Sequence, residues 1–153
     1  MATLKTTGLD EAIEEMERMG QLTGQVADAM LMVGAAWIAQ GLEQAARREG
    51  HEDTGELIAS IGYAASPKKV QDVPTIQVYA RGTDPDGVPN EDKAFVNEYG
   101  TTKIDPTQWW TEGEQEAEPK AVAGMIGVWS EFIQTGRVPQ VSGPGKYRKK
   151  RRN

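Results

Sequence analysis

Apolar residues recur at helical spacing in three segments of the chain, and each segment is predicted to form an amphipathic helix. The first is short and spans residues 8–19. The second spans residues 22–48, carries many small side chains, and is followed by Gly50, a residue typical of helix ends. The third spans residues 119–134 and is followed by Gly136. Its apolar stripe consists of Val122, Met125, Ile126, Trp129, Phe132 and Ile133.

The middle of the chain has the pattern of β-structure. Residues 75–81 alternate between apolar and polar side chains, which predicts a half-buried strand. Two further strands are predicted over residues 60–65 and 93–99. Gly100 ends the last of them, because the turn there needs a residue that tolerates positive φ. Turn-forming residues predict that residues 82–92 form a long polar loop.

These elements predict an α+β fold. With 153 residues, of which 38% are apolar, the chain is long enough to bury one core. We expect a small antiparallel β-sheet of three or more strands, packed against two N-terminal helices and one C-terminal helix. Residues 1–137 are predicted to form this single domain, and residues 138–153 a linker and a basic C-terminal tail.

The C-terminal tail is opposite in charge to the rest of the chain. Beyond residue 140 there is no acidic residue, and there are six cations: Lys146, Arg148, Lys149, Lys150, Arg151 and Arg152. The remaining 11 basic and 23 acidic side chains give residues 1–140 a formal charge of −12. Such asymmetry indicates a charged partner. With Tyr147 among them, the cations could bind DNA phosphates or an acidic protein surface, or the tail could stay solvated.

Few residues suggest catalysis or metal binding. Asp53-Thr54-Gly55 matches the aspartic-protease triplet, in which two carboxylates share a proton, and a homodimer could supply the second copy. A charged segment precedes the triplet where a protease needs an apolar strand, so we interpret Asp53 or Thr54 as the cap of a short helical turn. The chain has one histidine and no cysteine, which disfavours a zinc site. We therefore expect no catalytic residue, metal or cofactor.

The longest weakly charged run covers about residues 26–42. It contains Asp28 and is interrupted by Gly34 and Gly41. A membrane-spanning helix needs about 20 predominantly apolar residues. The sequence therefore predicts no membrane partner.

Two adjacent tryptophans, Trp109 and Trp110, follow the bend expected at Pro106. Large aromatic side chains contribute strongly to cores and to protein interfaces. Neighbouring side chains of an extended segment point in opposite directions. One tryptophan is therefore a candidate for the core and the other for an anchor between subunits.

Two short motifs resemble a known family. The pattern T-G-x-L-x-x-S-I occurs at residues 54–61, and F-V-x-E-x-G-T occurs at residues 95–101. In this order and at this spacing they resemble the phage tail-component family typified by the tenth gene product of phage HK97. The chain departs from the family pattern at residues 50–52, at the tryptophan pair, and in its basic tail.

The resemblance implies a structural virion protein, not an enzyme. Such proteins form closed rings, commonly six-fold, in the neck of long-tailed phages, where the head connector meets the tail. The implied partners are further copies of the chain, head-connector proteins, and tail-tube or tail-terminator proteins, with possible contact to DNA in the lumen. The implied location is the virion, after assembly in the host cytoplasm.

Within this family, Glu98 and Thr54 would make structural hydrogen bonds, and Asp53, Gly55, Gly100 and Thr101 would form caps and turns. A tail terminator or minor tail protein fits the same residues. Two other hypotheses do not depend on the resemblance. One is a nucleic-acid-binding module that uses the basic tail, and the other is a dimeric aspartic peptidase that uses Asp53.

Overall fold

The computed structural model describes residues 9–50, 55–64 and 66–141. Within these residues the elements, in chain order, are α1 (Leu9–Arg48), α2 (Glu56–Ser60), β1 (Ile61–Tyr63), β2 (Lys68–Val70), β3 (Val73–Thr75), β4 (Val78–Ala80), α3 (Asn90–Tyr99) and α4 (Trp109–Thr135). The strands pair antiparallel, and helices make up most of the rest. The predicted α+β class is therefore confirmed in broad terms.

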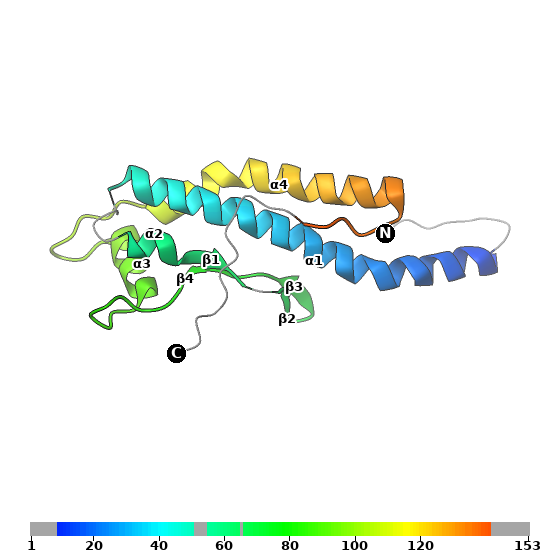
Figure 1. Ribbon diagram of the computed structural model, residues 1–153, viewed down its shortest axis with the longest axis horizontal. Coiled ribbons are helices and arrows are strands. Elements are labelled where there is room, and N and C mark those ends of the chain that lie inside the picture. Colours follow the sequence, from blue (N-terminus) through cyan, green and yellow to red (C-terminus); the bar gives the residue numbers. More distant parts are fainter. Residues whose placement is uncertain (1–8, 51–54, 65, 142–153) are drawn as a thin grey trace.

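Helix α1 forms the middle layer of the molecule. Helix α4 runs antiparallel to α1 along one side (Figure 1). The β1–β4 pair, α2 and α3 lie on the other side of α1 (Figure 1). The β2–β3 hairpin projects from that second side (Figure 1). Helix α3 also contacts α4, so the layer formed by the β1–β4 pair, α2 and α3 packs against both long helices.

Both long helices are longer than the helices predicted in the same segments. Helix α1 is continuous, so the prediction of two N-terminal helices is wrong. A glycine such as Gly20 costs a helix only about 1 kcal/mol, and no proline interrupts the segment. Helix α4 starts at Trp109, which places Pro119 inside it. The buried residues before and after Pro119 continue one face of the helix at four-residue spacing: Trp109, Gly113, Ala117 and Ala121.

The predicted sheet of three or more strands is also wrong, because the strands form two separate pairs. Strands β1 and β4 pair with Ile61 opposite Ala80 and Tyr63 opposite Val78. Strands β2 and β3 form a hairpin in a segment for which the sequence predicted no element. The two central residues of its turn, Gln71 and Asp72, both have positive φ, as the type I′ form of a two-residue hairpin turn requires.

The segment predicted as a third strand is helix α3. Its buried residues, Asn90, Ala94 and Glu98, are spaced by four. A strand would bury every second residue, but Asp92 is exposed and Val96 only half-buried, so the pattern is helical. Phe95 and Tyr99 share the same spacing and lie on the exposed side. The helix ends at Gly100, where φ is 73°. The end of the segment was therefore predicted correctly, and its type was not.

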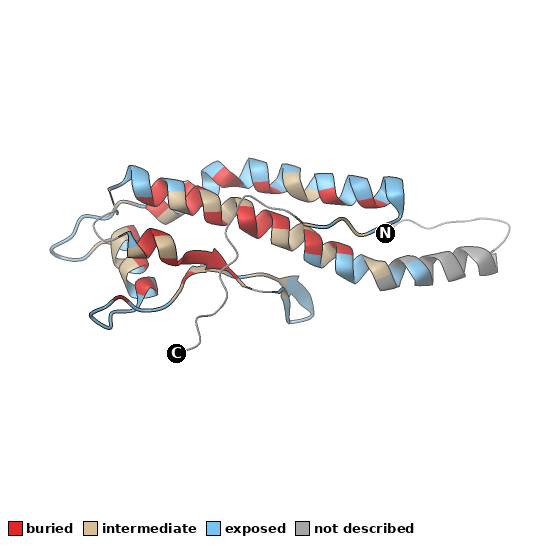
Figure 2. Ribbon diagram, in the orientation of Figure 1, coloured by how far each residue is buried: buried red, intermediate tan, exposed pale blue. Residues whose placement is uncertain are grey.

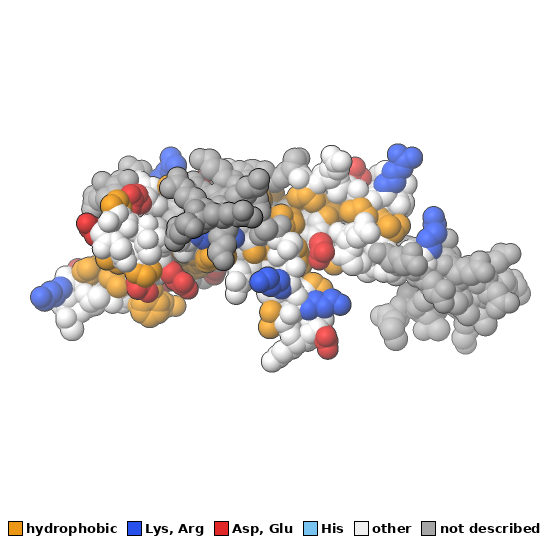
Figure 3. Space-filling model, turned by 60° about the horizontal axis from the view of Figure 1, so that its bottom comes forward, with side chains coloured by type: hydrophobic (Ala, Val, Ile, Leu, Met, Phe, Trp, Pro, Cys, Tyr) orange, Lys and Arg blue, Asp and Glu red, His pale blue; other side chains and the backbone are white. Residues whose placement is uncertain are grey.

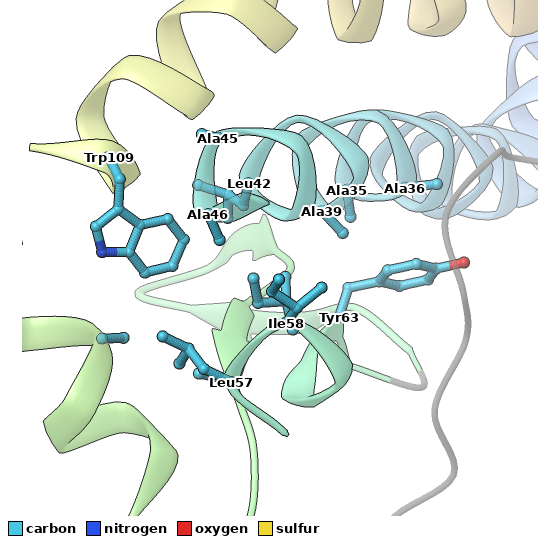
Figure 4. Close-up of a cluster of buried hydrophobic side chains, with 13 residues drawn as sticks. Ala35, Ala36, Ala39, Leu42, Ala45, Ala46, Leu57, Ile58, Tyr63 and Trp109 are labelled. Carbon is cyan, nitrogen blue, oxygen red and sulfur yellow. The ribbon is translucent and has the colours of Figure 1, made fainter. Parts of the chain in front are cut away.

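Two clusters of buried side chains form the core. The first lies between the C-terminal half of α1, α2, the β1–β4 pair, α3 and the start of α4 (Figure 4). It is centred on Leu42, Ile61 and Trp109, which are fully buried. The second lies between α1 and the C-terminal half of α4 and includes Val26 and Phe132. Val138 and Val141 pack against this second cluster, so the chain folds back after α4.

Glycines allow α1 and α4 to approach closely. A Cβ atom on Gly41 would lie 2.5 Å from the Ala117 Cβ and 2.8 Å from the Gly113 carbonyl oxygen. A Cβ on Gly124 would lie 2.6 Å from a methyl carbon of Val33. The packing of the two long helices therefore depends on missing side chains at these positions.

By length and composition, one stretch within the described residues, Leu22–Arg48 of α1, could cross a membrane. The core helix of a soluble protein passes the same test. In this fold the stretch lies between α4 and the β1–β4 pair, and it supplies most of the buried alanines (Figure 2).

Candidate functional site

The two motif stretches, residues 54–61 and 95–101, are close in the fold. Helix α2 packs against α3. Leu57 and Ile58 of the first stretch share the first core cluster with Ala94 of α3 and with Trp109 (Figure 4). The stretches therefore form one structural unit, which also holds the start of α4.

Glu98 joins this unit to α4. It is 5% exposed, and its carboxylate accepts the backbone N–H of Trp110 at 2.7 Å and that of Thr111 at 3.3 Å. The hydroxyl of Thr111 donates to the same carboxylate. The first N–H groups of a helix have no acceptor within the helix, and the helix dipole favours negative charge there. Glu98 thus has the structural hydrogen-bonding role expected of it, and its oxygens are occupied by α4.

Gly100 and Thr101 form a tight turn after α3. A Cβ at Gly100 would lie 2.6 Å from the Ile104 carbonyl oxygen and 2.7 Å from the Pro106 nitrogen. The Thr101 N–H donates to the Ile104 carbonyl at 2.8 Å. The Thr101 hydroxyl accepts the N–H groups of Lys103 and Ile104 at 3.2 and 3.1 Å. Both residues therefore shape the connection that leads into α4.

The first motif is described from Gly55 onward. Gly55 has φ of 65° and precedes α2. Ser60 closes the short helix with a hydroxyl hydrogen bond of 2.6 Å to the Leu57 carbonyl. The predicted capping residues Asp53 and Thr54 lie outside the described residues, and so does the protease interpretation of Asp53.

A buried ion pair fixes the loop before α3. Asp84, whose side chain is 7% exposed, pairs with Lys93 and accepts the Val88 N–H at 2.8 Å. The hydrogen bond from Lys93 and then the one from Val88 lower the pKa of Asp84. The pair ties the loop to the helix that carries Glu98. No local pattern indicated this pair beyond an acid and a base nine residues apart.

The tryptophans occupy different environments. Trp109 is fully buried in the first core cluster, which is the core position expected for one of the pair. Trp110 is half-buried, and its ring meets the Trp109 ring edge-on, with the ring centroids 5.3 Å apart. Its indole N–H donates to the Glu114 carboxylate at 2.9 Å. Its predicted role as a subunit anchor stays a prediction. The residues of the predicted basic tail, Lys146–Arg152, lie outside the described residues.

Sequence reasoning missed a surface on α4. The α4 stripe, defined here as Val122, Ile126, Trp129 and Ile133, has side chains that are 42–57% exposed. Helix α4 is buried on the side toward α1 and exposed elsewhere (Figure 2). At about 100° per residue, the stripe lies along a flank of α4, beside its buried face. The core instead receives the face of small residues that ends in Val128 and Phe132. Of the six residues in the predicted stripe, Phe132 is buried and Met125 is half-buried. Periodicity identified all six as apolar, but it could not tell that the other four are exposed.

Two further groups of apolar side chains are exposed. Phe95 and Tyr99 are 62% and 65% exposed on α3, with ring centroids 4.7 Å apart. Val70 and Val73 are 56% and 60% exposed at the tip of the β2–β3 hairpin. The most distinctive features of the described surface are therefore apolar.

Within the ranges given above, no group of three or more His, Asp or Glu side chains is placed to hold a metal ion.

Comparisons with protein-family models, with curated proteins and with solved structures found no match to this chain.

Proposed function

We propose that this chain is a structural virion protein of a long-tailed phage, a subunit of a neck or tail-completion ring between head connector and tail. The observation that carries the proposal is the α4 stripe, with four large apolar side chains exposed along one helix face. Monomeric proteins rarely expose contiguous apolar patches of this kind without a partner. A subunit that assembles through its surface needs such a patch.

The motif residues support the same proposal. Glu98, Gly100 and Thr101 hold the start of α4 in place, and Leu57 and Ile61 fill the core beneath it. Each therefore acts in positioning and packing. A protein that functions by assembling with others needs residues that position and pack its elements in this way. The proposal includes no catalysed reaction.

The experiment is a mass measurement of the purified chain in solution, alone and with head-connector and tail-tube proteins, at low and high salt. We expect a discrete ring, formed by the chain alone or in the presence of a partner. A chain that stays monomeric with every partner, and that is absent from purified particles, would contradict the proposal.

The basic tail is tested in the same experiment. A chain that lacks residues 142–153 keeps Val141 and therefore the second core cluster. If the tail docks on an acidic protein surface, the truncated chain should assemble less well and with less dependence on salt. If the tail contacts DNA, the truncation should leave the ring intact and abolish salt-sensitive DNA binding.

A further inference from the structure

The α4 stripe and the hairpin tip lie on opposite sides of α1. Helix α4, which carries the stripe on an exposed flank, lies on one side of α1, and the hairpin projects from the layer on the other side (Figure 1). Val70 and Val73 are direct cross-strand partners, so their side chains share one face of the hairpin. Because α1 separates the two surfaces, one copy of the chain cannot bring its own hairpin to its own stripe.

The two surfaces are complementary in charge and spacing. Lys68 precedes Val70 by two residues on the same hairpin face, about 6.6 Å along the strand. Glu118 precedes Val122 by one helical turn on the same face of α4, about 6 Å along the axis. Both charged residues are exposed, and neither has an ion-pair partner within the described part of the chain. The hairpin projects from the body and carries basic and hydrophobic side chains, with an acidic side chain, Asp72, at its turn (Figure 3).

We propose that the hairpin of one copy docks on the α4 stripe of the next, with Val70 and Val73 against Val122 and Ile126, and Lys68 facing Glu118. The contact joins two different surfaces, so it is heterologous and closes into a ring when the rotation between copies permits. This inference rests on the proposed self-assembly and specifies which surfaces carry it.

The decisive test mixes two variants of the full chain. The hairpin variant carries Val70→Asp and Val73→Asp, and the stripe variant carries Ile126→Asp. Each variant alone lacks one of the two surfaces and should remain monomeric. Their mixture retains one intact hairpin and one intact stripe, so it should form a heterodimer and nothing larger, as measured by native mass spectrometry.

A different geometry would give a different result. If two stripes pack against each other, the hairpin variant should assemble like the wild type. Mixing it with the stripe variant should then produce no heterodimer. That outcome would overturn the inference and leave the proposed function standing. A wild-type chain that never assembles, with or without virion partners, would overturn both.

Charge reversal tests the contact between Lys68 and Glu118. Lys68→Glu and Glu118→Lys should each weaken self-association about fivefold, and the double variant should restore it. Val88→Asp and Lys103→Glu are matched controls on exposed positions outside both surfaces, and they should assemble normally. Additive losses in the double variant would refute the pairing. Far-UV circular dichroism of every variant separates loss of assembly from loss of fold.

Discussion

At Gly100 the backbone combines φ of 73° with ψ of 178°, a region that glycine alone occupies without much strain. Gly100→Ala would add that strain to collisions with Ile104 and Pro106. We expect the free energy of unfolding, measured with urea, to fall by about 2–4 kcal/mol. Gly136→Ala is the control, because its φ is also positive but its Cβ would meet no atom within 4 Å. Gly136→Ala should lower the free energy of unfolding by about 1 kcal/mol. Equal losses would show that the close approach contributes nothing.

The start of α4 also depends on Glu98. Glu98→Gln keeps the size of the side chain but removes the charge from its bonds to Trp110 and Thr111. We expect a loss of about 1–2 kcal/mol in the free energy of unfolding, measured by thermal denaturation. Glu131→Gln, on the exposed side of the same helix, should change it by less than about 0.5 kcal/mol. A loss at Glu98 no larger than at Glu131 would rule out the capping role.

Asp84 should make stability depend on pH in the acid range. Its pKa is lowered in the folded chain by Lys93 and by the Val88 N–H. The carboxylate therefore adds stability that is complete above its unfolded pKa of about 3.9 and is lost as the pH falls through the lower folded value. Asp84→Asn should destabilise the chain at neutral pH, and the difference from wild type should shrink below about pH 4.

Urea unfolding at a series of pH values measures this difference. Asp105→Asn is the control, an exposed acid without an ion-pair partner in the described part of the chain. A difference between Asp84→Asn and wild type that persists unchanged in acid would mean that packing, and not charge, holds the loop to α3.

At the scale of elements, the contact between α1 and α4 depends on where glycines lie. Gly41→Ala would place a Cβ 2.5 Å from the Ala117 Cβ, whereas a Cβ on Gly24, in the same helix, would meet nothing within 4 Å. Alanine is favoured over glycine inside a helix by about 1 kcal/mol. We therefore expect Gly24→Ala to stabilise the chain by about 0.5–1 kcal/mol and Gly41→Ala to destabilise it by about 1–3 kcal/mol. Urea denaturation of both variants measures this, and two changes of the same sign would contradict it.

The same packing explains which elements the sequence could predict. Glycine positions correctly marked the C-terminal ends of α1, α3 and α4, because glycine tolerates the backbone conformations found there. The predicted start of the last helix at residue 119 was wrong, since Pro119 lies inside α4. Local patterns also located β1 and β4 approximately. The type of residues 90–99 depends on contacts of Ala94 and Glu98 with distant elements, which no local pattern contains.

The candidate site was predictable in part for a related reason. Gly55, Gly100 and Thr101 lie in turns as expected, because turn chemistry is local. The α4 stripe was detected, but its exposure was not. A helix with one large-residue face and one small-residue face can bury either, and close approach of α1 selects the small one.

For the whole molecule, the order of layers decides which surfaces remain for partners. Helix α1 is covered by α4 on one side and by the β1–β4 pair, α2 and α3 on the other. Each outer layer has one face that the described part of the chain does not cover. The α4 stripe and the hairpin tip are the apolar parts of those faces. A ring built from such a subunit can use both faces at once, one for each neighbour.

This arrangement predicts how stability depends on protein concentration. Ile126 is 57% exposed, so in dilute solution Ile126→Gln should change the free energy of unfolding by less than about 0.5 kcal/mol. Phe132 is 3% exposed on the face toward α1, so Phe132→Ala should lower the free energy of unfolding by about 3 kcal/mol at any concentration. Association stabilises the folded chain by mass action. The thermal midpoint of the wild type should therefore rise with concentration, and that of Ile126→Gln should not. A wild-type midpoint independent of concentration would place the α4 stripe outside any contact between copies and leave a different partner to cover it.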